Sequence, residues 1–436
     1  MAQSPSESTL SNRGAELIGK PLRDDFELFH DAEQNAYHPD DNPDGAISLC
    51  IAENVLSWPD MRERLVSASA KTPPVWVAKY TDVRGAPEFR EALAGFAERR
   101  ITTLGNQRAQ PLNPDCFCVS SGATAIVELT ALLLGDSGDV AAFPAPCYPV
   151  YRQDVGHKAK LERYDIEPAT PWEDVEPGVH PLSVADLDRS LADIQQQGKR
   201  LRLLVLTQPD NPTGAIYTAE QLRDFSAWSI AHEVHLCVNE LYALSQVDTK
   251  DARIAADYPE QPTPYSSFLH ELELRQSAYL HWWYSFSKDF GISGLRCGVM
   301  YTRNADLLEA FGNYAAPHTV SNHTQWLLTQ VLNDDAWVEA FAKTNQARLT
   351  DSYAAVVTAL RERNIGYRVA RGSLFVWAKF NTGEGSDEAF WRKLYDEHRV
   401  LLTSPGGFGQ EEDGWLRLVY SCVETKALDA ALGRFL

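Results

Sequence analysis

The stretch Ser285-Phe-Ser-Lys-Asp-Phe-Gly-Ile-Ser-Gly-Leu-Arg-Cys-Gly298 decides how this chain is interpreted. The apolar residues just before it, Tyr279-Leu-His-Trp-Trp283, are typical of a buried strand. Lys288 therefore follows a strand end, inside a loop of Ser and Gly. Burial in a cleft lowers the pKa of a lysine and makes its amine a nucleophile towards an aldehyde. Two serines and Arg296 add hydroxyls and a fixed cation, which together suit a phosphate group.

An amine that forms a Schiff base beside a phosphate site indicates pyridoxal 5'-phosphate (PLP) as a cofactor. The alternative for so short a motif is a lysine in a solvated loop. The other strand ends bear on this choice, because ligands of parallel α/β sheets bind at the carboxyl ends of the strands.

Four more predicted strands end in polar turns. Ser120-Ser-Gly-Ala-Thr124 opens a helix, so its free N–H groups can hold a phosphate. Phe143-Pro-Ala-Pro-Cys-Tyr-Pro149 presents Tyr148, either as an aromatic that stacks on a ligand or as a turn residue packed on the core. Gln208-Pro-Asp-Asn-Pro-Thr-Gly214 is a turn by composition. Val238-Asn-Glu-Leu-Tyr242 follows it at a spacing that allows one crossover connection.

Strand-like and helix-like segments alternate from about residue 115. We expect an α/β fold, with a large domain built on a mostly parallel sheet covered by helices and a smaller α+β domain. Polar residues and prolines in 249–275 predict a surface insertion. The expected division is an N-terminal arm (1–30), the N-terminal part of the small domain (31–75), the large PLP-binding domain (76–325) and a small C-terminal domain (326–436).

Composition argues against several classes of function. The chain of 436 residues has a formal net charge of −20, which opposes non-specific binding to nucleic acids or anionic membranes. Its seven cysteines are scattered, and Cys116-Phe-Cys118 is too closely spaced for a zinc pair, so we expect free thiols and no metal site. No run is long enough to span a bilayer, and the polar first residues lack the apolar core of a signal peptide. A cytoplasmic protein is therefore expected.

The ordered motifs closely resemble those of fold-type I PLP enzymes, namely the class I/II aminotransferases and 1-aminocyclopropane-1-carboxylate (ACC) synthase. The resemblance covers the chain from about residue 35, and the segments Asn42-Pro-Asp-Gly45 and Ala52-Glu-Asn54 are more similar to ACC synthase than to ordinary aminotransferases. It implies that Lys288 carries PLP as a Schiff base and then acts as the general base at the substrate α-proton. The residues that it assigns to the cofactor are Gly122, Ala123, Thr124, Tyr148, Asn211, Asn239, Tyr242, Ser285, Ser287, Lys288, Arg296 and Tyr80.

The same resemblance implies particular roles. Tyr148 stacks on the cofactor ring, and Asn211 and Tyr242 reach the ring oxygen, with Tyr242 counted beside Lys288 as catalytic. For the amino-acid substrate, Arg417 grips the α-carboxylate and Glu53 faces the amine. Tyr80 matches a tyrosine that crosses a dimer interface, which implies a homodimer with shared active sites.

Asn239 departs from the family, which almost always has Asp at this position. That Asp pairs with the protonated ring nitrogen and makes the ring a strong electron sink. An amide has no charge to hold this proton, and the adjacent Glu240 points to the opposite face of the strand. Transamination benefits most from a ring that withdraws electrons strongly. Loss of a leaving group such as a thiolate can instead remove the negative charge that forms at the substrate α-carbon. The resemblance to ACC synthase also weakens at Val83-Arg-Gly85, where those enzymes have Tyr-His-Gly.

We therefore expect a carbon–sulfur (β/γ-elimination) lyase acting on an amino acid or amino-acid conjugate, similar to the carbon–sulfur lyase branch of fungal ACC-synthase-like proteins of secondary metabolism. The alternative is an aminotransferase that passes the amino group to a 2-keto acid. An inactive relative and a PLP-binding regulatory module are further hypotheses. The last needs a basic DNA-binding segment, which residues 1–35 do not provide.

Overall fold

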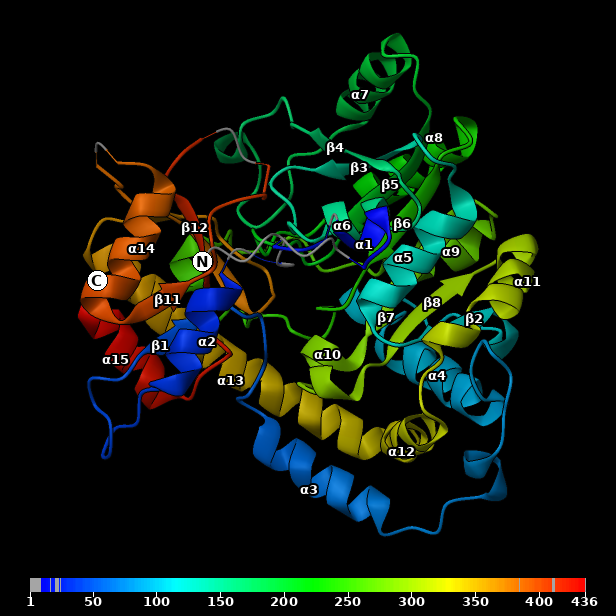
Figure 1. Ribbon diagram of the computed structural model, residues 1–436, viewed down its shortest axis with the longest axis horizontal. Helices are drawn as coiled ribbons and strands as arrows, with labels where there is room; N and C mark the ends of the chain where they lie inside the picture. The colour runs from blue at the N-terminus through cyan, green and yellow to red at the C-terminus, as the bar shows by residue number, and fades with distance from the viewer. Residues whose placement is uncertain are drawn as a thin grey trace.

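A computed structural model describes residues 9–435 except 16, 20–22, 24, 384 and 410–411 (Figure 1). Much of the predicted N-terminal arm, including residues 1–8, therefore lies outside the described residues. Among the described helices, none is long and apolar enough to cross a membrane.

A seven-stranded sheet forms the centre of the molecule. Its strands follow the order β2-β8-β7-β6-β5-β3-β4, and β8 is antiparallel to both of its neighbours while the other pairs are parallel. This confirms the mostly parallel sheet predicted from the sequence. The strands are β2 (Phe117–Ser120), β3 (Val140–Pro144), β4 (Glu162–Ile166), β5 (Leu201–Thr207), β6 (His235–Asn239), β7 (Leu280–Ser285) and β8 (Gly298–Thr302).

Both faces of this sheet are buried, because successive side chains of each strand enter different apolar clusters. On β6, Cys237 packs with helices α5, α6 and α11, whereas Leu236 and Val238 pack on the opposite side with α4, α7, α8 and α9. The first group is α5 (Ala123–Leu134), α6 (Tyr151–Gly156) and α11 (Ala305–Tyr314). The second is α4 (Pro87–Arg100), α7 (Val184–Gln196), α8 (Ala219–Ala231) and α9 (Phe268–Arg275).

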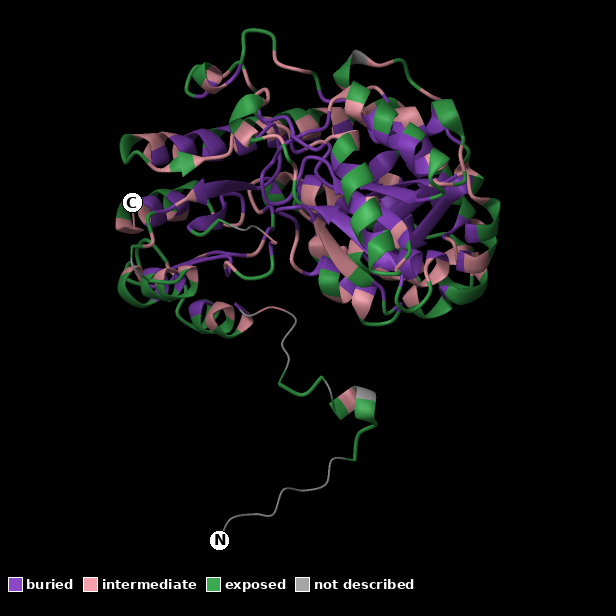
Figure 2. Cartoon of the chain, turned by 90° about the horizontal axis from the view of Figure 1, so that it is seen from above, coloured by how far each residue is buried: buried purple, intermediate pink, exposed green. Residues whose placement is uncertain are grey.

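A smaller module of two short sheets lies beside the large one, with its own buried strands (Figure 2). Here β1 (Ile47–Leu49) pairs in parallel with β11 (Val400–Leu402), and β10 (Phe375–Lys379) pairs antiparallel with β12 (Trp415–Val419) and β9 (Gly366–Tyr367). The module thus joins residues from both ends of the chain. The remaining α-helices are α1 (Asn12–Ala15), α2 (Phe26–Gln34), α3 (Trp58–Ser69), α10 (Phe286–Asp289), α12 (Asn322–Leu332), α13 (Asp335–Glu362), α14 (Asp387–His398) and α15 (Thr425–Phe435).

One sequence expectation needs correction, while the four-part division of the chain stays a prediction. Residues 249–275 are not wholly a surface insertion, because Tyr265 is buried and α9 buries Phe268, Leu269 and Leu272 against the large sheet. The helix is short and its apolar residues alternate with charged ones, so composition hid its buried face.

Candidate active site

Lys288 lies in α10, a single helical turn that follows directly on β7. The Ser285 hydroxyl begins this turn by accepting a hydrogen bond from the Ser287 N–H (3.2 Å). The ammonium group donates to the carbonyl oxygen of Ala52, from the chain just after β1. Burial lowers the pKa of Lys288 to about 8, against the opposing effect of the Glu53 carboxylate. Lys288 is therefore a buried amine of which a part is neutral near pH 7.

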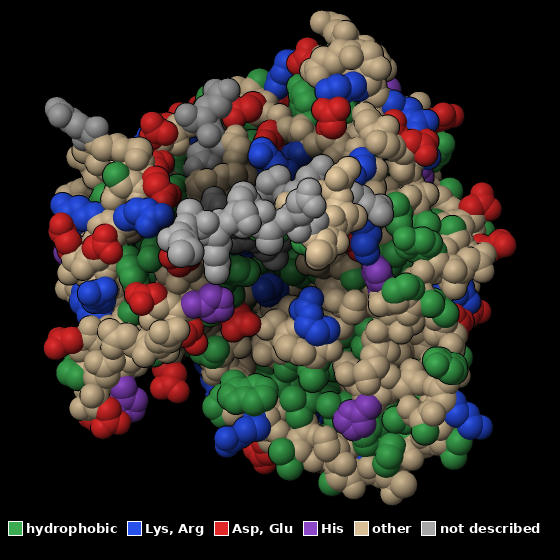
Figure 3. All heavy atoms as spheres, viewed as in Figure 1, with side chains coloured by type: hydrophobic (Ala, Val, Ile, Leu, Met, Phe, Trp, Pro, Cys, Tyr) green, Lys and Arg blue, Asp and Glu red, His purple; other side chains and the backbone are tan. Residues whose placement is uncertain are grey.

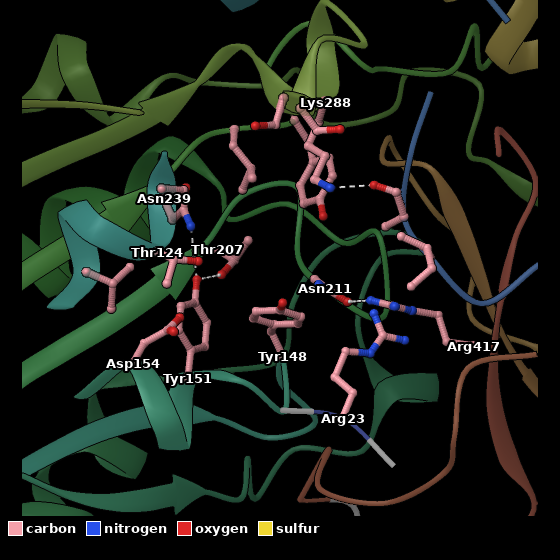
Figure 4. A pocket seen from close by; sticks show the side chains of 18 of the residues that line it. Arg23, Thr124, Tyr148, Tyr151, Asp154, Thr207, Asn211, Asn239, Lys288 and Arg417 are labelled. Carbon is pink, nitrogen blue, oxygen red and sulfur yellow. Dashed lines mark hydrogen bonds between the residues drawn. The ribbon is translucent and has the colours of Figure 1, made fainter. Parts of the chain in front are cut away.

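A cavity of about 210 Å³ lies beside this amine, at the carboxyl ends of the strands (Figure 4). It brings together ten of the fourteen residues singled out from the sequence: Ala123, Thr124, Tyr148, Asn211, Asn239, Tyr242, Ser287, Lys288, Arg296 and Arg417.

The other four residues do not line the cavity. Gly122 and Ser285 lie behind its wall, where Gly122 precedes α5 and the Ser285 hydroxyl donates to that of Ser287 (2.8 Å). The Glu53 carboxylate is exposed and accepts a hydrogen bond from Ser293 Oγ (2.8 Å). The Tyr80 side chain is fully exposed to solvent.

The turn before α5 is shaped for close approach to a small group. Gly122 has φ +98°, and a Cβ there would lie 2.3 Å from Arg296 Nη2. A Cβ on Gly298 would lie 2.4 Å from the backbone of Gly122. Thr124 and Ser287 add hydroxyls to the same wall. The N-terminus of a twelve-residue helix, an arginine and two hydroxyls together form an anion-binding cradle.

Arg417 is buried within β12 and fixed on several sides. Its Nη1 donates to Asn211 Oδ1 (2.8 Å), its Nε to Thr403 Oγ1 (3.2 Å), and its Nη2 to the Cys50 carbonyl oxygen (3.3 Å). Burial and, to a lesser extent, the nearby Arg23 guanidinium lower the pKa of Arg417 to about 10. The guanidinium group stays charged at neutral pH, and its three hydrogen bonds orient it so that it could bind a carboxylate.

At the other end of the cavity, Asn239 belongs to an uncharged hydrogen-bond chain. Its Nδ2 donates to Tyr151 Oη (3.0 Å), which lies 2.9 Å from Thr207 Oγ1. Among the described residues, Asn239 Oδ1 is buried without a hydrogen-bond partner. The amide therefore presents a free acceptor at the end of β6.

Glu240 cannot replace the missing carboxylate, as the alternation along the strand predicted. It is fully buried on the opposite side and accepts five hydrogen bonds, at 2.7 to 3.0 Å. The donors are the Phe268 N–H and the side chains of Gln208, Tyr265, Ser267 and Trp282. With five donors around it, this carboxylate is fixed away from the cavity.

A sequence model of the aminotransferase class I and II family matches residues 58–435. The chain belongs to this family. As a class I/II aminotransferase-family protein it is a PLP-dependent enzyme, of the lyase or aminotransferase kind.

Curated relatives of this family protein are ACC-synthase-like. It is 28% identical to the probable inactive ACC synthase-like protein 2 of Mus musculus, over 98% of this chain and 71% of the relative. It is also 28% identical to ACC synthase 6 of Arabidopsis thaliana, over 94% of this chain and 81% of the relative. Among solved structures, aspartate aminotransferase from Thermotoga maritima shares the fold with a TM-score of 0.73, at 20% identity over 98% of each chain.

The residues of the cavity fit PLP. The N-terminus of α5, the Arg296 guanidinium and the hydroxyls of Thr124 and Ser287 suit its phosphate, because they offer positive charge and hydrogen-bond donors. The buried amine of Lys288 suits its aldehyde. The orphaned Asn239 Oδ1 suits a donor, and a protonated ring nitrogen is such a donor.

Sequence reasoning missed five polar residues that line this cavity, namely Arg23, Tyr151, Asp154, Thr207 and Ser293. Thr207 ends β5, and Tyr151 and Asp154 lie three and six residues beyond Tyr148, so strand ends and helical spacing could have indicated them. Burial raises the pKa of Asp154 to about 8, so its carboxyl is mostly neutral at pH 7. Arg23 stands in a segment without a motif, and no sequence signal marks it.

Proposed function

We propose that this protein is a PLP-dependent lyase that cleaves a carbon–sulfur bond in an amino acid or amino-acid conjugate by β- or γ-elimination. The observation that carries the proposal is the uncharged end of the cavity, where Asn239 stands in place of a carboxylate and Glu240 is fixed on the other face. Without a negative charge at the ring nitrogen, a substrate that expels its own leaving group has the advantage over one that must store charge on the cofactor.

The proposed roles of the side chains follow from their positions. When bound, PLP withdraws electrons from the α-carbon of an amino acid and so makes the α-proton removable. Lys288 Nζ would hold the aldehyde group and would take that proton as the free amine, whose neutral fraction the lowered pKa increases. Arg417 holds the α-carboxylate, and Asn211, which Arg417 orients, turns its remaining amide hydrogens to the ring oxygen.

Tyr148 and Tyr242 complete the proposed ring site. Both line the cavity, and burial raises the pKa of each phenol, so both stay protonated and can donate. The Tyr242 hydroxyl has no hydrogen-bond partner among the described residues and is thus available to the ring oxygen.

The decisive experiment supplies amino acids and cysteine conjugates to the holoenzyme without any keto acid. Cofactor absorption and released ammonia are followed together. Continuous release of ammonia and thiol, with the starting spectrum restored, is the expected result. One equivalent of converted cofactor without ammonia would instead establish an aminotransferase and overturn the lyase proposal.

An aminotransferase is the second candidate, and a particular observation favours it. The free Asn239 Oδ1 can accept a hydrogen bond from a protonated ring nitrogen, so the ring keeps part of its electron-withdrawing power. The mouse relative is named a probable inactive protein, so an inactive protein is also an outcome to test. In that case the same experiment gives neither ammonia nor converted cofactor.

We also propose a homodimer in the cytoplasm. Tyr80 is fully exposed in the single chain, and the exposed Trp58, Val66 and Val75 precede it on α3 and the following turn. Burying these apolar side chains against a second copy would remove them from water and carry Tyr80 towards the neighbouring site. All seven cysteines are free thiols, as a reducing compartment favours.

A further inference from the structure

A second cavity of about 210 Å³ adjoins the active site, because Arg23, Tyr148 and Arg417 line both spaces. Figure 4 shows the two arginines side by side, on the far side of Tyr148 from Asn239. The rest of the wall of this second cavity comes mainly from α6, the residues just before it, and the loop between β11 and β12. A substrate held by Arg417 therefore has free space next to it that the cofactor does not need.

The walls of this second cavity are electropositive. Three arginines line it, Arg23, Arg152 and Arg417, against the single carboxylate of Asp25. Arg23 already engages that carboxylate through two hydrogen bonds, one of them 2.8 Å long. The excess of positive charge is local, since the whole chain has a net charge of −20. In the space-filling view of Figure 3, Lys and Arg side chains lie among Asp and Glu side chains on the described surface.

Arg152 is the guanidinium that remains free. It lies on α6, one residue beyond Tyr151, and is exposed. Among the described residues, its side chain has neither a hydrogen bond nor an ion pair. Thr403 and Ser404 line the same cavity and bring a hydroxyl each. A planar cation and hydroxyl donors in one cavity are suited to a carboxylate.

The loop between β11 and β12 packs closely on Pro149, two residues before α6. Gly407 has φ +84°, and a Cβ there would lie 3.1 Å from Pro149 Cβ. The backbone of this loop is thus held close to the start of α6, and the cavity has a defined outer wall.

We propose that this second cavity binds a carboxylate at the far end of the substrate side chain, with Arg152 as its partner. The inference rests on the proposed function, in which Arg417 holds the α-carboxylate. The substrate class is then an amino acid with a second anionic group beyond the sulfur. The thiol that leaves carries this carboxylate away.

The test uses pairs of ligands that differ only in this charge. S-carboxymethyl-L-cysteine and S-carbamoylmethyl-L-cysteine form one pair, and the 2-carboxyethyl and 2-carbamoylethyl homologues form a longer one. Equilibrium binding of each to the holoenzyme is measured through the cofactor spectrum, at low salt. In at least one pair the acid should bind about tenfold more tightly than the amide.

Arg152→Gln should lower this acid-to-amide ratio by about threefold to tenfold. Arg223→Gln, at an exposed position of α8, is the matched control and should leave the ratio unchanged. Equal binding of acid and amide in both pairs, or an unchanged ratio in Arg152→Gln, would overturn the inference. Because the readout is binding, a charge preference without thiol release would refute the lyase and still support the subsite.

Discussion

The two ends of the active-site cavity differ in charge. Around Arg417 the wall contains two guanidinium groups, and the Lys288 amine lies nearby. Around Asn239 it contains an amide, a phenol, a hydroxyl and the Asp154 carboxyl, which is mostly neutral at pH 7. The protein thus places fixed positive charge at the Arg417 end and keeps the Asn239 end neutral. Substrate binding and electron withdrawal are separate properties that substitutions can change one at a time.

Removing the charge at the Arg417 end should have the largest effect. We expect Arg417→Leu to lower kcat/KM for an amino-acid substrate roughly 100- to 1,000-fold, because two charge-assisted hydrogen bonds to a carboxylate are worth about 3–4 kcal/mol together. Steady-state kinetics of thiol release measures this. Arg417→Lys keeps the charge but not the planar fork, and a variant with wild-type kinetics would contradict the assignment.

The amine between the two ends should make cofactor uptake depend on pH. Burial disfavours the charged form of Lys288 and lowers its pKa to about 8, so the amine is mostly protonated, and not nucleophilic, below that pH. The rate at which apoprotein takes up PLP should therefore rise about tenfold per pH unit up to pH 8 and then level off. Stopped-flow absorption between pH 6 and 9.5 checks this. A rate that still rises at pH 9.5 would show an unperturbed lysine.

Replacing Asn239 with Asp should give the Asn239 end of the cavity the carboxylate that the family almost always has at this position. With Asn239→Asp we expect transamination to appear, or to rise about tenfold, as a side reaction, since a full negative charge holds the proton on the ring nitrogen. Keto-acid-dependent amino transfer measures it. Loss of PLP binding in this variant would count against the account of the site.

Glu240→Gln is a matched control for that change, one residue away on the opposite face. It should leave the cofactor spectrum as it is but lower the melting temperature, because a carboxamide cannot accept from all five donors. A spectral change in Glu240→Gln comparable to that in Asn239→Asp would show that the two faces are not independent.

The smallest effect concerns the orientation of the amide. Tyr151→Phe removes the hydroxyl that holds Asn239 Nδ2, so we expect a few-fold loss of activity, or about 1 kcal/mol. The ring nitrogen should also lose its fixed acceptor, which ¹⁵N resonance of labelled cofactor detects directly. In an Asn239→Ala background the Tyr151→Phe change should have little further effect, and additive effects would show that the two residues act separately.

Lys288 could be predicted from its place at a strand end, whereas Asn211 and Arg417 were assigned by the resemblance to the family's motifs. All three line the cavity although they are far apart in sequence. Arg417 lies inside β12, so strand ends alone would not have indicated it. Tyr151 was missed because its role depends on a contact with the departure at Asn239, and no motif contains both. Arg23 was missed because its segment has no hydrophobic periodicity, and without periodicity the sequence does not indicate which way a side chain points.

Parts of the fold were hidden for related reasons. The buried face of α9 consists of a few apolar residues among charged ones, and only packing against the large sheet reveals it. The direction of Glu240 was predictable because strand alternation is a local rule. The five hydrogen-bond donors around Glu240 come from separate segments of the chain, so they could not be predicted from the sequence.

The pairing of Ile47 with Val400 in the small sheet has a consequence for biosynthesis. Ala52 and Cys50, just beyond β1, supply the carbonyl oxygens that hold Lys288 and Arg417. Translation delivers β1 well before its partner strand and Arg417. The active site therefore cannot be completed before β11 and β12 have been translated, and we expect capture of the cofactor to follow their synthesis. When PLP is scarce, cells should accumulate the translated protein without cofactor and not stalled nascent chains.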